Sequence, residues 1–165
     1  KETNKHKVSF SKENKPLGTV GGIKKIKFSD NKDIIITNCD GIFDINFEAL
    51  LEYHMTSKAK ITIVASRKIV KIPYGVCQPE KSQKYLKKLN EKPSLDFLVN
   101  TGLYVVKPEV IKLIPQNKYY DFTDLLNKVK KNKSKIAIYP IESEKWNDVG
   151  QWETLKLTEE AFKKI

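Results

Sequence analysis

Two short runs of β-branched residues, separated by a helix-like segment, constrain the fold of this chain more than any other feature. Residues 34–36 are three isoleucines, and residues 61–65 form a second apolar, β-branched run. Runs of this length suit strands in the interior of a sheet. Residues 47–54, which lie between them, repeat apolar side chains at helical spacing. Buried strands that alternate with helices predict an α/β fold.

Apolar periodicity and turn signals predict the other strands and helices. They are a strand around Val8 and Phe10, strands at 74–78, 85–90, 97–106 and 136–141, and helices that begin at Pro108, at the cap Asp121 and near Gly150. The last of these helices would bury Trp152, Leu155 and Phe162.

The helix that includes residues 47–54 has two candidate caps, Asp44 and Asn46, because both side chains accept hydrogen bonds from the first free N–H groups. His54 falls on the apolar stripe of the same helix. The sequence therefore predicts that His54 is a packing residue and not a catalytic base.

Charge patterning indicates a lysine-covered surface. The chain holds 31 lysines and arginines against 20 acidic residues, a formal net charge of +11, and Arg67 is its only arginine. The lysines are spread along the whole chain, which is typical of a solvated surface, although a lysine-lined site for phosphates is the alternative. Proteins that read nucleic-acid bases rely on arginine for bidentate contacts, so we expect no nucleic-acid partner.

Length and cysteine usage narrow the class of protein further. The sequence has no apolar run long enough to span a membrane, so we expect no membrane partner. Cys39 and Cys77 are too few for a disulfide framework and lack the spacing of a zinc site. A cytoplasmic, reducing compartment fits this usage. The 165 residues predict a single domain over 1–165.

Two acidic residues follow the pattern of a cation site. Asp40 comes just after the strand at 34–36, and ligands in open α/β sheets bind beyond the carboxyl ends of strands. Asp148 precedes the last predicted helix. Mg²⁺ needs one or two carboxylates plus substrate oxygens, so this pair would suffice if the side chains converge. The alternative is that each aspartate only caps a turn or helix.

Three further segments carry polar or glycine-rich chemistry. Three glycines fall within residues 18–22. Their missing Cβ atoms allow either the close approach of a ligand or a structural turn. Their spacing fits neither a Walker loop nor the glycine motif of dinucleotide-binding proteins. Glu91-Lys92-Pro93 could face a sugar phosphate or form an exposed turn. Asn100 and Thr101 interrupt an apolar strand, so they either satisfy neighbouring backbone groups or face a ligand.

Together these segments occur in the order typical of one enzyme family. They are Pro16-Leu17-Gly18-Thr19-x-Gly21, Asn38-Cys39-Asp40, Tyr74-Gly75-Val76, Glu91-Lys92-Pro93, Asn100-Thr101-Gly102-Leu103-Tyr104 and Trp146-x-Asp148-Val149-Gly150. From about residue 15 to about residue 154, the chain resembles the sugar-1-phosphate nucleotidyltransferases, or NDP-sugar pyrophosphorylases. Within them it is most similar to the bacterial mannose-1-phosphate and heptose-1-phosphate guanylyltransferase-like branch.

The resemblance implies a GT-A-like variant of the Rossmann fold, with a mixed, mostly parallel sheet flanked by helices and incomplete at the N-terminus. It implies a transfer of NMP from an NTP to a sugar 1-phosphate, which gives an NDP-sugar and pyrophosphate with Mg²⁺ as cofactor. A role in cytoplasmic nucleotide-sugar and polysaccharide biosynthesis goes with that reaction.

The resemblance also assigns roles to single residues of this chain. The expected catalytic residues are Asp40, Lys92 and Asp148, of which the two aspartates hold Mg²⁺ and the lysine binds the sugar phosphate. The remaining assignments are Gly18, Thr19 and Gly21 to the base and ribose of the nucleotide, and Gly75, Glu91, Asn100 and Thr101 to the sugar.

The chain departs from the family pattern in two places. Cys39 stands where the family usually has a glycine before the metal aspartate. Nothing before Pro16 matches the family's GxGxRxxP…KP loop, which grips the triphosphate, so we expect the C-terminal portion of a nucleotidyltransferase domain with poor turnover on its own. The alternative is a non-catalytic sugar-nucleotide-binding or regulatory subunit. The base, the sugar and the oligomeric state stay open, a homo-oligomer being one option.

Overall fold

The structure is a computed structural model that describes residues 8–29 and 31–150. The described residues divide into two compact units. Unit 1 comprises the described residues up to 36, residues 51–62 and residues 105–137. Unit 2 comprises residues 37–50, residues 63–104 and the described residues from 138 onward.

A four-stranded sheet, in the order β1-β6-β3-β7, contributes residues to both units. Its strands are β1 (Ile34–Thr37), β6 (Ser94–Val106), β3 (Ile61–Lys71) and β7 (Ile136–Ile141). These four strands confirm the predictions at 34–36, 61–65, 97–106 and 136–141, although β3 and β6 are longer than expected. Their added length lies in polar or exposed sequence, where apolar runs give no signal.

Two predictions about the N-terminal region are wrong. The run at 34–36 forms β1, but this strand is not fully buried, because it lies at the edge of the sheet, and Ile35 is 40% exposed. Val8 and Phe10 lie in no strand and are 71% and 97% exposed. Alternation over three residues is too short a pattern to specify a strand without a partner to pair with.

Four helical segments lie wholly within the described residues of unit 1. They are α1 (Gly18–Gly21), the 3-10 turn η1 (Gly22–Lys25), α3 (Pro108–Ile111) and α4 (Phe122–Lys131). Pro108 opens α3 and Asp121 is the N-cap of α4, as predicted, with Asp124 accepting a hydrogen bond from the Asp121 N–H at 3.2 Å. The Lys24 ammonium donates to the Ile111 carbonyl at 3.1 Å, which fastens η1 to the end of α3.

His54 is fully buried in unit 1, which confirms its prediction as a packing residue. Its Nδ1 lies 2.6 Å from the Thr62 hydroxyl. Its Nε2 has no hydrogen-bond partner among the described residues and lies 3.9 Å from the Asp33 carboxylate, which accepts a hydrogen bond from Lys107 at 2.9 Å. Burial lowers the pKa of His54, and the nearby Asp33 charge only partly opposes this.

This environment predicts that the protein loses stability as the pH falls below about 6.5, the ordinary histidine pKa. The unfolded chain binds the proton more readily than the folded chain, so acid favours unfolding. Urea unfolding between pH 8 and pH 5 should therefore show a falling free energy of unfolding, and His54→Asn should flatten that part of the profile. An unchanged pH profile in His54→Asn would contradict the assignment.

Unit 2 contains two small antiparallel ladders besides its part of the large sheet. β2 (Gly41–Phe43) pairs with β8 (Trp146–Asp148), and η2 (Ser143–Lys145) directly precedes β8. β4 (Val76–Pro79) pairs with β5 (Leu86–Asn90), which confirms the two short strands predicted around a turn.

Helix α2 (Phe47–Ser57) runs from unit 2 into unit 1. Of its two candidate caps, Asn46 is the one used. The Asn46 side-chain oxygen accepts hydrogen bonds from the N–H groups of Glu48 and Ala49, at 2.9 and 3.0 Å.

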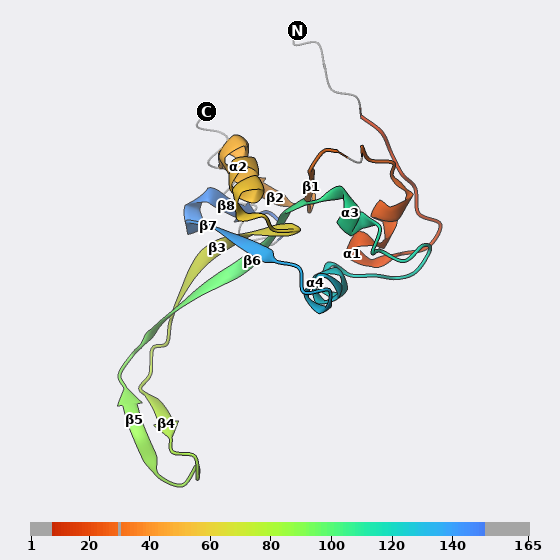
Figure 1. The fold of residues 1–165 in the computed structure, drawn as a ribbon. Coiled ribbons are helices and arrows are strands. Elements are labelled where there is room, and N and C mark those ends of the chain that lie inside the picture. The colour runs from red at the N-terminus through yellow and green to blue at the C-terminus, as the bar shows by residue number, and fades with distance from the viewer. Residues whose placement is uncertain (1–7, 30, 151–165) are drawn as a thin grey trace. The chain divides into compact units, whose positions relative to one another are not determined.

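The hairpin β4–β5 sits at the far end of the paired strands β3 and β6, away from the other elements of unit 2 (Figure 1). We call residues 67–98 the arm. Large apolar side chains are exposed along it, among them Tyr74 at 74% and Leu86 at 59%. We call the segments around Ile72 and Pro93 the neck of the arm. There the Ile72 N–H donates a hydrogen bond to the Pro93 carbonyl at 3.0 Å.

Three other sequence expectations concern single features. The helix predicted near Gly150 lies outside the described residues. In the part of the chain that the structure describes, each helix is too short or too polar to cross a membrane. Cys39 and Cys77 are both free and exposed.

Candidate functional site

Asp40 and Asp148 are brought together in unit 2 by the β2–β8 ladder. Asp148 pairs with Gly41, the residue after Asp40, and the Val149 N–H donates to the Asp40 carbonyl at 3.0 Å. The Gly150 N–H donates to Asp148 Oδ1 at 3.0 Å. Two acids more than 100 residues apart in the chain are therefore held at the same end of one ladder.

Their carboxylates also converge. A Cβ atom built on Gly150 would lie 3.0 Å from Asp40 Oδ2 and 3.1 Å from Asp148 Oδ1. Both oxygens thus border one small space that only a glycine leaves open. Asp40 is exposed and Asp148 is half-buried, so substrate oxygens can reach this space.

The donor set suits a hard cation such as Mg²⁺, which prefers carboxylate oxygens and keeps positions for water and phosphate. No group of three or more histidine, cysteine or acidic side chains is placed to hold a metal among the residues that the structure describes. The protein donors here would be the two carboxylates. The hydrogen bond from Gly150 to Asp148 is equally the turn contact that the alternative interpretation predicts.

Asn38 and Gly102 connect two of the predicted motifs within unit 2. The Asn38 N–H donates to the Gly102 carbonyl at 3.2 Å. Gly102 has a φ of +80°, and a Cβ atom there would lie 2.6 Å from the Asn38 side-chain nitrogen. The turn that carries Asp40 and the Asn100-Thr101-Gly102 segment are thereby packed together, a contact between residues too far apart in the chain for a sequence pattern to predict.

Asn100 and Thr101 differ in how their polar groups are used. The Thr101 hydroxyl donates to the Val64 carbonyl at 2.8 Å, and Thr101 is only 4% exposed. This geometry favours the interpretation that Thr101 satisfies neighbouring backbone. Asn100 is exposed, and its amide donates to the Tyr104 hydroxyl at 2.6 Å and accepts from the Gly102 N–H at 3.2 Å. Asn100 therefore remains accessible to a ligand.

Thr101→Val tests this difference. The variant keeps the shape of the side chain but leaves the buried Val64 carbonyl without its donor, so we expect a loss of about 1–2 kcal/mol in the free energy of unfolding. Chemical denaturation measures it, with the exposed Thr37→Val on β1 as a control that should change little. A stable Thr101→Val variant that binds sugar poorly would instead support a direct sugar contact.

Gly75 and Glu91 also come together in unit 2. A Cβ atom on Gly75 would lie 2.9 Å from Glu91 Oε2 and 3.3 Å from the Leu89 side chain, so the carboxylate lies over the Gly75 backbone. Lys92 has a φ of +44°, which is uncommon for a residue with a side chain and disfavoured before a proline such as Pro93. Both Glu91 and Lys92 are exposed at the neck of the arm.

The glycine-rich segment lies in unit 1 and forms the helical turn α1, which agrees with the structural-turn alternative. Gly18 has a φ of +77°, and a Cβ atom on it would lie 2.7 Å from the Tyr120 carbonyl oxygen. A Cβ atom on Gly21 would lie 2.7 Å from the Lys118 carbonyl oxygen. Close packing against residues 118–121 therefore accounts for both glycines without a ligand.

Thr19 is used in the same contact. Its N–H donates to the Asp121 carboxylate at 3.0 Å, and its hydroxyl accepts from the Phe122 N–H at 2.8 Å. The hydrogen bond from the Thr19 N–H lowers the pKa of Asp121 below its ordinary value. The segment thus caps α4, and its predicted nucleotide role rests on the family resemblance.

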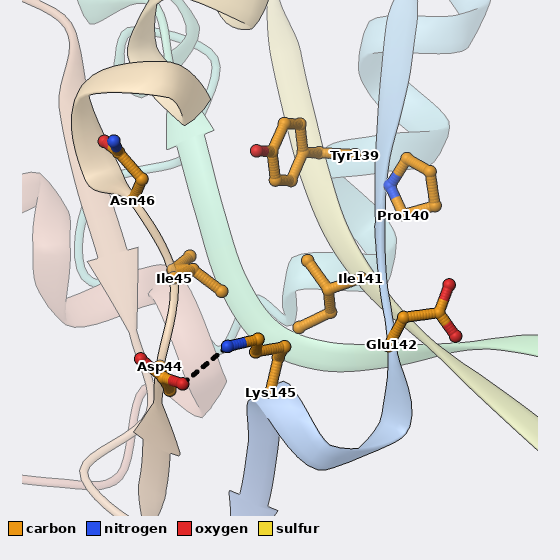
Figure 2. A pocket seen from close by; sticks show the side chains of 8 residues that line it. All are labelled: Asp44, Ile45, Asn46, Tyr139, Pro140, Ile141, Glu142 and Lys145. Carbon is orange, nitrogen blue, oxygen red and sulfur yellow. Dashed lines mark hydrogen bonds and ion pairs between the residues drawn. The ribbon is translucent and has the colours of Figure 1, made fainter.

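Sequence reasoning missed a groove of about 580 Å³ at the opposite end of the β2–β8 ladder from Asp40 and Asp148. In Figure 2, Lys145 reaches across the groove to Asp44, to whose carboxylate its ammonium donates at 2.6 Å. This bond raises the pKa of Lys145. The other lining residues are Ile45, Asn46, Tyr139, Pro140, Ile141 and Glu142. In sequence these residues look like a cap and surface charges, so no spacing signal marks them.

Comparison with known proteins gives consistent sequence matches. A family model described as nucleotidyl transferase matches residues 1–164. Mannose-1-phosphate guanyltransferase 2 of Candida glabrata is 35% identical over 152 residues, which cover 87% of this chain and 41% of that protein. Mannose-1-phosphate guanyltransferase of Debaryomyces hansenii is 34% identical, with the same coverage. The chain therefore spans about two fifths of the length of these relatives.

Solved structures share the fold. HddC from Yersinia pseudotuberculosis matches with a TM-score of 0.63 and 21% identity, over 91% of this chain and 64% of that chain. The same protein complexed with GMP-PN matches with a TM-score of 0.61. The predicted class, an α/β fold of the nucleotidyltransferase type, is thereby confirmed.

Proposed function

The chain belongs to the nucleotidyl transferase family, and we propose that it serves the transfer of a nucleoside monophosphate from a nucleoside triphosphate to a sugar 1-phosphate. The observation that carries the proposal is the convergence of the Asp40 and Asp148 carboxylates around one space. The family motifs assign these two residues to the metal that accompanies the phosphates.

We further propose that the nucleotide is GTP. The matched relatives are named as mannose-1-phosphate guanyltransferases, and a protein of the same fold has been crystallised with GMP-PN. A hexose or heptose 1-phosphate is the corresponding class of acceptor.

The reaction is a displacement at phosphorus. A phosphate oxygen of the sugar 1-phosphate attacks the α-phosphorus of GTP in line. The bond from the α-phosphorus to the bridging oxygen breaks, and pyrophosphate leaves with the electron pair. Such a step depends on positioning and charge neutralisation more than on covalent chemistry by the protein.

Asp40 and Asp148 would hold Mg²⁺ in this scheme. When bound, the ion neutralises phosphate charge and orients the triphosphate. The hydrogen bond from the Gly150 N–H keeps Asp148 Oδ1 in place, and the pairing of Gly41 with Asp148 holds the neighbouring Asp40 close to it.

The sugar phosphate would be bound by residues at the neck of the arm and on β6. Lys92 presents a mobile positive charge, which suits a phosphate group. Glu91 accepts from sugar hydroxyls beside the bare Gly75 backbone, and Asn100 supplies a further polar contact. For Thr101, the buried hydrogen bond to Val64 favours a supporting role on β6 over a sugar contact.

The base and ribose would contact Gly18, Thr19 and Gly21, as the family motifs suggest. Further proposals concern the whole protein. They are a single domain over 1–165, a cytoplasmic location, a role in polysaccharide biosynthesis, no nucleic-acid or membrane partner, and homo-oligomerisation.

A thermal-shift panel tests the function. With Mg²⁺ present, GTP and GDP-sugars should raise the melting temperature more than the uridine and adenosine equivalents, because a ligand that binds only the folded state stabilises it. Pyrophosphate release with GTP and several sugar 1-phosphates measures the transfer itself. Binding without any release would support the non-catalytic sugar-nucleotide-binding alternative. The absence of a shift with every nucleotide would contradict both functions.

A further inference from the structure

Gly150 lies against both carboxylates of the cation site proposed above. A Cβ atom at this position would lie 3.0 Å from Asp40 Oδ2, 3.7 Å from Asp40 Cγ and 3.1 Å from Asp148 Oδ1. The two distances to carboxylate oxygens are shorter than most real contacts of a Cβ atom, whereas the 3.7 Å to Asp40 Cγ is an ordinary contact. A methyl group at Gly150 would therefore press on the two acids at once.

The backbone does not require a glycine here. Gly18 and Gly102 have φ values of +77° and +80°, in the left-handed region that disfavours other residues. Gly150 has no such positive φ, so its φ gives no reason for a glycine. What the position excludes is the volume of a side chain, and the atoms that exclude it are the oxygens of Asp40 and Asp148.

We propose that Gly150 is a positioning residue for the divalent cation, because its bare Cα lets the Asp40 and Asp148 carboxylates converge while its N–H orients Asp148. The inference rests on the proposed function. Mg²⁺ binds oxygens at about 2.0–2.1 Å in near-ideal octahedral geometry, so a displacement of a few tenths of an ångström is enough to weaken the site. A methyl group at Gly150 forces such a displacement on at least one carboxylate.

The test measures cation binding directly. Mn²⁺ takes the same oxygen ligands as Mg²⁺, and its free concentration can be followed by electron paramagnetic resonance during titration. Gly150→Ala should weaken Mn²⁺ binding at least tenfold while its melting temperature without Mn²⁺ stays at the wild-type value. Asn147→Ala is the matched control, because Asn147 precedes Asp148 on β8 and so points to the opposite face, and it should bind Mn²⁺ normally.

The outcomes separate this inference from the proposed function. Wild-type affinity for Mn²⁺ in Gly150→Ala would overturn the role of Gly150 and leave the cation site standing. A wild-type protein that binds Mn²⁺ no better than Asp148→Asn would overturn both. A Gly150→Ala variant that unfolds without Mn²⁺ would also overturn the role, since the glycine would then be needed for the fold.

Discussion

Asparagine in place of Asp40, or of Asp148, is expected to abolish the Mg²⁺-dependent stabilisation of this protein by a GDP-sugar. The substitution removes one negative charge and keeps the shape of the side chain. In Asp148→Asn the side-chain oxygen can still accept from the Gly150 N–H, so the turn survives. Loss of a direct ligand should lower the affinity for the metal by at least about 100-fold, because loss of a residue that only hydrogen-bonds a ligand already lowers that affinity by about 10–100-fold.

The measurement is the rise in melting temperature produced by a GDP-sugar with and without Mg²⁺. Asp96→Asn is the control, because Asp96 lies on the exposed arm, where it forms an ion pair with Arg67 at 3.6 Å. That variant should respond to Mg²⁺ as the wild type does. If Asp40→Asn and Asp148→Asn both keep the full response, the metal assignment is wrong.

Gly18→Ala should destabilise the protein by about 2–5 kcal/mol, with or without nucleotide. A left-handed conformation costs a residue with a Cβ atom about 1–2 kcal/mol, and overpacking adds about 1–3 kcal/mol. The contact is with the Tyr120 carbonyl oxygen at 2.7 Å. That oxygen is held by hydrogen bonds from the N–H groups of Val20 and Gly21, so it cannot easily move away.

Urea unfolding of Gly18→Ala measures this loss, and Gly22→Ala is the matched control. Gly22 lies in the next turn without a positive φ, and the nearest neighbours of its added methyl group would be atoms of the flexible Glu13 side chain, whose carboxylate accepts a hydrogen bond from the Leu17 N–H at 3.0 Å. We expect a change within about 1 kcal/mol for that variant. A Gly18→Ala protein of normal stability that fails to bind nucleotide would show that the glycine serves the ligand instead.

The elements that the sequence predicts well are those specified by local patterns. Pro108 and Asp121 mark helix starts by their own chemistry, and the isoleucine run at 34–36 marks a strand. The half-exposure of β1 could not be predicted, because it depends on the place of β1 at the edge of the sheet. Nor could the helical turn at Gly18, which packs against a segment about 100 residues later in the chain.

The candidate site shows the same division. Residue type and position after a strand mark Asp40 as a candidate, and the motif order does the same for Asp148. The convergence of their carboxylates depends on the register of β2 against β8, in which Gly41 opposes Asp148, and a single sequence contains no signal for that pairing. The role of Gly150 depends on its contacts with the two carboxylates, which no sequence pattern shows. The role of Thr101 depends in the same way on the hydrogen bond from its hydroxyl to the Val64 carbonyl.

The hairpin at the end of the arm has a consequence for the order of folding. Its turn is closed by a hydrogen bond from the Glu80 N–H to the Tyr85 carbonyl at 2.9 Å, so its contacts join residues close in the chain. Hairpins of this kind form within about 1–10 μs, yet two strands alone are only marginally stable. The hairpin will therefore form and melt repeatedly before β1 and β6, which are far apart in the chain, have paired. In the native protein its amide hydrogens should exchange with solvent before those of the large sheet.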